Sequence, residues 1–526
     1  MSITVPQALL VGLIYYAANT SFLCGLAYFT TWRPLVNGFL VGLVLGDPVR
    51  GAMAGGLVNV LYLGYLSVGG TLGIGDAALA GITGAVAAIA LPLPHDQAIG
   101  VGAIAGLLLG NLGFPLLSLR MKLDGRIVRR MDQAAERGDA RAVMLWNVLP
   151  AQALLFGLTV PTATVLAISI SLLCASAAAL PPWLLRGLAV SGNYLAGALG
   201  IALAMRWVFK GWGIALFLAG AIVAAIPGSA PLLAASSGAG LVAIAVCAAA
   251  AIPIVSKRMR PKAATGERAP RSAFWLWQFF SHSAYSFERL QGSGFACALA
   301  PSIRRWHAGA SDRAAALARH LAFFNTEVNL GSMIVSIAAG MERERASGQL
   351  DAVDEDIGRV KSQLMGVVAG AGDPIVQGAI LPAILSLGLV TLFGGGVLID
   401  PAIPALLYAA AIGTVMFAIS FLSFRAGHVY GRDAAVKLLA NRPFRRVAEA
   451  AERVGAFALG MLAMLVAAGN APAINGAPMH ALVGQVLTLM LILALYAAVQ
   501  RLRVRPLYVL LTLVAAGVML AGLNVI

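Results

Sequence analysis

Residues 33–80 read RPLVNGFLVGLVLGDPVRGAMAGGLVNVLYLGYLSVGGTLGIGDAALA, and this stretch decides the fold class. It is long and apolar, yet asparagines and aspartates interrupt it, among them Asn59 and Asp76, and glycines cluster between residues 69 and 75. Non-helical backbone at membrane depth is tolerated only where protein buries it or where it lines a watery cavity. The glycine-rich break beside Asp76 therefore predicts a binding region built by broken or re-entrant helices.

The whole chain has the composition of a membrane protein. Of its 526 residues, 60% are hydrophobic and 11% are charged, whereas a soluble domain carries about 25% charged residues. A bilayer-spanning helix needs about 20 mostly apolar residues, and stretches such as 98–119, 481–499 and 507–525 reach that length. The sequence predicts an all-α polytopic membrane protein with roughly ten spanning or re-entrant segments.

The formal net charge is +15, and the basic residues are distributed along the chain as in a multi-pass membrane protein. Lys and Arg gather in polar segments at residues 120–141, 257–271 and 501–505, and such clusters typically mark cytoplasmic loops. None of them alternates with aromatic residues, as a groove for single-stranded nucleic acid would require. We therefore interpret the charge as setting membrane orientation and expect no nucleic-acid partner.

The cysteines and the N-terminus carry no special chemistry. Cys24, Cys174, Cys247 and Cys297 are scattered and show no metal-ligand spacing, so we expect no disulfide framework, no metal site and no cofactor. The first 14 residues contain no Lys or Arg, unlike a cleavable signal peptide, and we expect the N-terminus to be retained.

Hydropathy divides the chain into two membrane blocks around a wetter middle. Residues 256–272, SKRMRPKAATGERAPRS, have six Lys or Arg against one acid and no apolar periodicity, which is typical of a linker. The polar zone beyond it predicts helices at the cytoplasmic face. The predicted units are a membrane domain at 1–255, a basic cytoplasmic linker at 256–273, and a second domain at 274–526, divided into cytoplasmic-face helices at 274–366 and a membrane part at 367–526.

One helix of the polar zone can be placed more closely. Ser311 and Asp312 are a suitable helix start. Residues Ala314, Leu317, Leu321 and Phe324 then recur at helical spacing and predict one apolar face.

Two ordered series of motifs resemble a known transporter family. The first block carries RPL at 33–35, LGD at 45–47 and a glycine-rich turn ending in DAAL at 76–79. The second carries FERLQ at 287–291, GF at 294–295, HL at 320–321, FFNTE at 323–327, LMG at 364–366 and GAGDP at 370–374. In order, these resemble the IIC and IID subunits of the mannose/fructose/sorbose family of the sugar phosphotransferase system (PTS). Together the two resemblances cover nearly the whole chain.

The resemblance implies two pseudo-homologous membrane blocks that form the membrane-translocating component of a sugar permease. Such a permease moves a hexose or amino sugar inward across the bacterial cytoplasmic membrane, coupled to phosphorylation by separate IIA and IIB proteins. IIB would dock on the cytoplasmic face, and the chain would assemble as a homotrimer. A PTS-derived solute transporter that works without phosphotransfer is the alternative.

The polar residues of these motifs are the candidates for sugar contact. Sugar hydroxyls donate and accept hydrogen bonds, so a sugar site needs carboxylates and amides. An ionisable side chain in a spanning segment is costly and by default functional. Glu288 and Arg289 have an equally weighted alternative role as a structural ion pair or a helix-anchoring pair. His320 could border the sugar, but a lone histidine on a mixed helix is more often a packing residue. His282 could serve as a hydrogen-bonding residue near the start of the second motif series. The predicted substrate-binding residues are Asn59, Asp76, Glu288, Gln291, Asn325, Glu327, Asp373 and Gln377.

We predict no catalytic residues in this chain. The GAGD sequence at 370–373 lacks the GK[ST] ending of a phosphate-binding loop, and the six histidines are scattered. The phosphoryl group would therefore come from a separate IIB protein.

Overall fold

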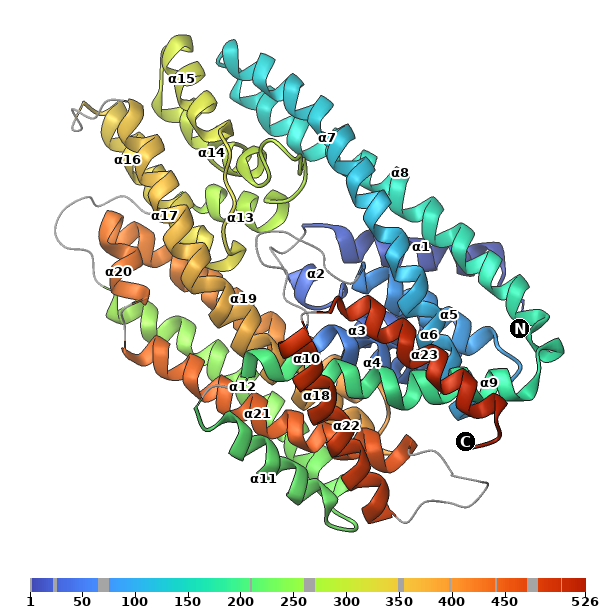
Figure 1. Cartoon of the computed structure of the whole chain (residues 1–526). Helices are drawn as coiled ribbons and strands as arrows, with labels where there is room; N and C mark the ends of the chain where they lie inside the picture. The colour runs from blue at the N-terminus through green and yellow to red at the C-terminus, as the bar shows by residue number, and fades with distance from the viewer. Residues whose placement is uncertain are drawn as a thin grey trace.

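The computed structural model describes residues 2–21, 26–64, 75–208, 211–259, 270–348, 354–396, 399–439, 442–470, 481–502 and 504–526. Within these ranges the regular structure is helical, and the only β-bridge joins Leu290 to Phe324. Figure 1 shows the helices packed into one elongated body. The predicted all-α fold is confirmed.

The first block contains long apolar helices and several short connecting ones. In chain order they are α1 (Val5–Asn19), α2 (Leu26–Phe29), α3 (Pro34–Leu45), α4 (Pro48–Leu63), α5 (Ala77–Ala90), α6 (His95–Leu109), η2 (Gly110–Leu112), α7 (Gly113–Glu136), α8 (Ala140–Ala175), η3 (Ala177–Ala179), α9 (Pro182–Val190), the π-helix η4 (Ser191–Leu195), α10 (Ala196–Val208), α11 (Gly213–Ala225) and α12 (Ala230–Arg258).

The second block begins with shorter helices and continues into long apolar ones. They are α13 (Arg271–Phe280), α14 (Gly292–Trp306), α15 (Ala310–Leu321), α16 (Val328–Ala346), α17 (Asp354–Ile375), the π-helix η5 (Val376–Ile380), α18 (Leu381–Gly395), α19 (Ala402–Tyr430), η6 (Gly431–Asp433), α20 (Ala434–Leu439), α21 (Arg442–Asn470), α22 (Ala481–Leu502) and α23 (Pro506–Gly522).

Seven helical stretches of the described chain are long and apolar enough to cross a membrane, in agreement with a multi-pass protein. They are His95–Glu136, Ala140–Ala175, Pro182–Arg206, Ala230–Arg258, Ile357–Gly395, Ala402–Asp433 and Val483–Arg501. Shorter apolar helices accompany them at Val5–Asn19, Pro34–Leu45, Ala77–Ala90, Gly213–Ala225 and Pro506–Gly522.

Two candidate spans are interrupted by a π-helix, one in each block. The π-helix η4 separates α9 from α10, and η5 separates α17 from α18. Such segments are rare and often lie at functional sites. The glycine-rich break predicted at residues 69–75 falls almost entirely on residues 65–74, which lie outside the described residues.

The two blocks are packed into each other through small residues. A Cβ atom on Gly460 of α21 would lie 1.9 Å from the carbonyl oxygen of Phe217 in α11. Likewise, a Cβ atom on Gly187 of α9 would lie 2.6 Å from Cα of Val518 in α23, and Figure 1 shows α23 running beside α9. Because close approach of this kind needs small side chains, the blocks form one packed interior.

The polar zone forms a helical region at one end of the body. Figure 1 places α15 beside the junction of α7 and α8, with α14 next to it. The predicted helix start at Ser311–Asp312 is confirmed within two residues, since α15 begins at Ala310. Leu317 and Leu321 are buried on it as predicted. Phe324 is also buried, but it lies beyond the end of α15 in the bridged segment.

The predicted linker is bounded by helices at both ends. Residues 256–258 form the last turn of α12, and α13 begins at Arg271. Residues 260–269 lie outside the described residues.

A buried ionic cluster joins α14, α15 and α16. The carboxylate of Glu342 accepts hydrogen bonds from His307 Nε2 at 3.0 Å, His320 Nε2 at 2.8 Å and Arg319 Nε at 3.2 Å. Burial lowers the pKa of His320, so its neutral imidazole is the donor. Burial of Glu342 opposes ionisation, but the donors from His307, His320 and Arg319 outweigh it and lower the pKa of this carboxyl below its usual range. His320 is therefore a structural residue of this cluster.

Candidate substrate-binding site

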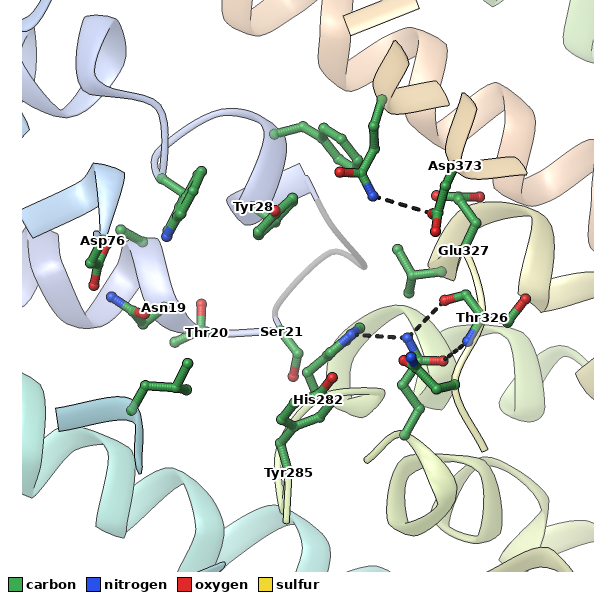
Figure 2. A pocket seen from close by; sticks show the side chains of 18 of the residues that line it. Asn19, Thr20, Ser21, Tyr28, Asp76, His282, Tyr285, Thr326, Glu327 and Asp373 are labelled. Atoms are coloured by element: carbon green, nitrogen blue, oxygen red, sulfur yellow. Dashed lines mark hydrogen bonds between the residues drawn. The ribbon is translucent and has the colours of Figure 1, made fainter. Parts of the chain in front are cut away.

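A cavity of about 220 Å³ lies between the two blocks and is lined by residues of both. Figure 2 shows Asp76 and Asn19 on one side and Thr326, Glu327 and Asp373 on the other. Of the eight predicted residues, the structure brings six together on its wall: Asp76, Gln291, Asn325, Glu327, Asp373 and Gln377. Their part in sugar binding remains a prediction.

Asp76 reaches the cavity because it caps α5. Its Oδ1 accepts hydrogen bonds from the backbone N–H groups of Ala78 at 2.8 Å and Leu79 at 3.2 Å. Its Oδ2 accepts from the hydroxyl of Tyr15 at 2.6 Å. An aspartate is a strongly favoured N-cap, so this residue type satisfies the helix start and also gives the cavity a carboxylate.

Glu327 is likewise the N-cap residue of its helix, α16. Its carboxylate accepts from the backbone N–H of Leu330 at 2.7 Å, and from the backbone N–H and side-chain amide of Asn329 at 3.2 and 2.9 Å. Burial raises the pKa of Glu327 to about 7, although these donors act in the opposite direction. Glu327 is therefore largely ionised only above neutral pH.

Asp373 and Gln377 enter the cavity from the broken helix. Asp373 lies in the last turn of α17, directly before Pro374, and Gln377 lies in the π-helix η5. The side-chain amide of Gln377 donates to Oδ1 of Asp373 at 3.3 Å. Gly372 faces Glu327, where a Cβ atom would come within 2.8 Å of Cβ of Glu327. This close approach brings the Asp373 turn beside the start of α16.

Lys361 anchors α17 to the helical region that precedes it. Its Nζ atom is buried and donates to the carbonyl oxygens of Arg319, His320 and Ala322 at 3.3, 3.0 and 3.2 Å. A cation at the C-terminal end of a helix is stabilised by the helix dipole. The contact fixes α17, and with it Asp373, relative to α15.

Gln291 joins two segments of the second block at the cavity wall. Its amide donates to the carbonyl oxygen of Thr326 at 3.0 Å and accepts from the Thr326 N–H at 3.1 Å. The preceding residue, Leu290, has a φ of 46°, which is uncommon for a non-glycine residue. Nε2 of Gln291 also lies 3.1 Å from Nε2 of His282. Burial lowers the pKa of His282 to about 4, so it is neutral at the cavity wall.

The first block binds the segment around His282 through polar side chains. Arg120 donates to the carbonyl oxygens of His282 at 2.8 Å and Ser283 at 3.0 Å. Its Nε lies 3.4 Å from the carboxylate of Asp124, which accepts from the N–H of Tyr285. The cavity wall therefore depends on contacts between the blocks.

Sequence reasoning missed several residues of the wall. Tyr28 and Trp32 line the cavity and stack with ring centroids 4.8 Å apart. Arg33, which does not line it, lies 5.1 Å from the Trp32 ring. Arg120 and Thr326 were also not predicted. The aromatic pair directly before the RPL motif was a usable signal, because binding pockets are commonly lined by aromatic rings. No local signal identified Arg120, which lies in a basic segment with many other arginines.

Two predicted residues do not line the cavity. Asn59 is buried in α4, where its Oδ1 accepts from the backbone N–H of Leu35 at 3.1 Å. Glu288 is exposed on the turn before α14. Its neighbour Arg289 forms an ion pair with Asp132 at 3.3 Å. The ion pair of this segment therefore joins Arg289 to Asp132 and not to Glu288.

Comparison with known proteins assigns both blocks. Residues 266–526 match the family described as the PTS system mannose/fructose/sorbose family IID component. Residues 5–250 match the PTS system sorbose-specific IIC component.

Individual relatives match each block over about two thirds of their own length. The sorbose-specific EIID component of Klebsiella pneumoniae is 31% identical over 191 residues, covering 36% of this chain and 67% of that protein. The mannose-specific EIID component of Escherichia coli K12 is 32% identical, covering 36% of this chain and 65% of that protein. The fructose permease IIC component of Bacillus subtilis is 29% identical, covering 35% of this chain and 66% of that protein.

A solved structure gives a weaker match. A chain in the complex of the mannose transporter ManYZ with microcin E492 is 25% identical, with a TM-score of 0.29, covering 51% of this chain and 99% of that one. The assignment therefore rests on the sequence matches to both blocks. The chain belongs to the mannose/fructose/sorbose family of the phosphotransferase system and joins a IIC component and a IID component, which are membrane permease subunits, in one polypeptide.

Proposed function

We propose that this chain carries a hexose or amino sugar inward through the cavity between its two blocks, and that separate IIA and IIB proteins phosphorylate the sugar. The observation that carries the proposal is the composition of the cavity wall. The IIC block supplies Asp76, and the IID block supplies Asn325, Asp373 and Gln377. Carboxylates and amides pair with sugar hydroxyls, and the Tyr28–Trp32 stack offers an apolar face.

In this proposal the chain positions the sugar and does not itself carry a phosphoryl group. The P–N bond of a phosphohistidine on IIB breaks, an O–P bond forms on a sugar hydroxyl, and the hydroxyl proton is released. We place IIB on the face formed by α13–α16, and a homotrimer is the assembly that family membership suggests.

The alternative is a solute transporter that has kept the fold but works without phosphotransfer. Right-side-out membrane vesicles, prepared with and without purified mannose-type IIA and IIB in the lumen, separate the two functions. We expect uptake and phosphorylation of one sugar from a panel of hexoses, amino sugars and N-acetyl sugars only with phosphoenolpyruvate and the full relay. Uptake of unmodified sugar without IIA and IIB would favour the alternative.

The linker is predicted to lie on the cytoplasmic side. Six Lys or Arg in residues 256–272 resist translocation across the membrane. In a variant with Cys247 replaced by serine, Thr265→Cys should resist an impermeant thiol reagent in intact cells and react after permeabilisation. Equal labelling of this cysteine in intact and in permeabilised cells would contradict the prediction, because it would place the linker outside the cell.

Residues of the two blocks should be energetically coupled if they bind one sugar. Alanine at Asp76 or Asn325 should each weaken sugar binding by about 1–3 kcal/mol, where a buried partner loses its hydrogen bond. A double-mutant cycle should give an interaction energy above about 0.5 kcal/mol, since independent sites more than about 7–10 Å apart are additive. Strict additivity with normal binding in both single variants would assign these residues to packing.

A further inference from the structure

The charged side chains that line the cavity are mostly acidic. Asp76, Glu327 and Asp373 all line it, and Arg120 is the only Lys or Arg on the described part of its wall. Arg120 is already engaged, because its guanidinium faces Asp124 and donates to two backbone carbonyl oxygens. Above neutral pH, where Glu327 is largely ionised, the wall therefore presents an excess of negative charge to whatever enters the cavity.

Two of these carboxylates also occupy helix N-termini that face the cavity. Asp76 accepts the N–H groups two and three residues along α5, and Glu327 accepts the corresponding N–H groups of α16. A helix N-terminus is otherwise a ready binding site for phosphate, because free N–H groups and the helix dipole both favour an anion. Here the chain has filled both positions with its own negative charge.

We propose that the cavity selects by charge, so that it accepts a neutral sugar and excludes the phosphate ester of the same sugar, with Asp76 and Glu327 as the residues that determine this selectivity. The proposal rests on the proposed function, in which the ester is the product.

The chemistry of the two ligands explains the distinction. A sugar hydroxyl can donate a hydrogen bond to a carboxylate, whose two oxygens together offer about four lone-pair positions. A phosphate monoester carries about two negative charges above pH 7, and it would meet three buried carboxylates. Phosphorylation would therefore turn a bound ligand into a repelled one and drive its release.

The test measures ligand binding by the purified full-length chain in nanodiscs at pH 8, by calorimetry. The probes are D-mannose, D-fructose and L-sorbose, with mannose 6-phosphate and fructose 1-phosphate. The variants are Asp76→Asn, Glu327→Gln and the double variant. Because Asn is as good an N-cap as Asp, the start of α5 should be preserved.

A matched control is available at another helix start. Asp139 caps α8 through the N–H of Ala142 at 3.0 Å but is exposed and does not line the cavity. Asp139→Asn should leave the affinities for sugar and ester unchanged.

We expect wild type to bind the ester at least about 30-fold more weakly than the sugar, and each variant to raise the ester's affinity by roughly tenfold, as removal of a nearby charge predicts. A merely structural defect would weaken both ligands. The inference fails if wild type binds the ester as tightly as the sugar, or if the double variant leaves the ester's affinity unchanged. If no neutral sugar binds to well-folded wild type, the proposed function fails and this inference fails with it.

Discussion

Replacing Glu342 by alanine is expected to destabilise the fold by about 3–5 kcal/mol, the cost of removing one partner from a buried ionic group. The carboxylate is fully buried and accepts from His307, Arg319 and His320. Without it, the Arg319 guanidinium and two imidazole N–H groups lose their buried acceptor. The free energy of unfolding in detergent, measured with increasing denaturant, checks the prediction.

Glu344→Ala, two residues further along α16, is the matched control. Glu344 is only partly buried, and a surface change of this kind costs at most about 0.5 kcal/mol. Equal unfolding free energies for the two variants would show that the Glu342 cluster contributes nothing special.

The lowered pKa of Glu342 predicts how the stability of the fold changes with pH. The pKa of Glu342 is lowered in the folded state, so its contribution to stability is complete above the unfolded value of about 4.3. It is lost progressively as the pH falls below that value. Wild type should therefore lose more stability than Glu342→Gln between about pH 5 and pH 3. Parallel pH profiles for the two proteins would contradict this assignment.

The second large effect is expected at the cavity. Asp76→Asn should reduce phosphoenolpyruvate-dependent sugar uptake by at least about fivefold, because it removes a charge and a hydrogen-bond acceptor worth about 1–3 kcal/mol from a buried site. Asp76 is 6% exposed and lines the cavity. The amount of protein in the membrane should be unchanged, since Asn retains the N-cap.

Uptake by this variant is compared with that of Asp139→Asn at equal protein level. Asp139→Asn also changes an N-cap aspartate but lies outside the cavity, so it should transport normally. Uptake by Asp76→Asn within about twofold of wild type would show that no hydrogen bond important for transport was lost. Asp76 would then be only the cap of α5.

Much of the fold could be predicted because membrane helices are specified by length and apolar composition. The two-block arrangement also followed from the sequence, since the basic segment at 256–272 separates two ordered sets of motifs. The packing of α11 on α21 and α9 on α23 could not be predicted, because these contacts join residues far apart in the chain through glycine and other small residues that look alike in sequence.

The candidate site was predicted in part, for a definable physical reason. Asp76 and Glu327 stand directly before apolar helices, so the pattern that makes them N-caps also makes them conspicuous in sequence. Asn59 matched a family motif but lies inside α4, where it bonds to the backbone of α3. Arg120 and His282 line the wall together because two segments 162 residues apart in the chain are in contact there. A local sequence pattern does not predict such a long-range contact.

The most direct test of the central claim is a cryo-EM map of the full-length chain in nanodiscs with the transported sugar bound. The account predicts density for one monosaccharide between Asp76 on the IIC side and Asn325 and Asp373 on the IID side, beside the Tyr28–Trp32 stack. It also predicts that this density disappears when the sugar is omitted. Sugar density at a place that none of these residues reaches, with the cavity empty, would contradict the claim that the two blocks share one binding site.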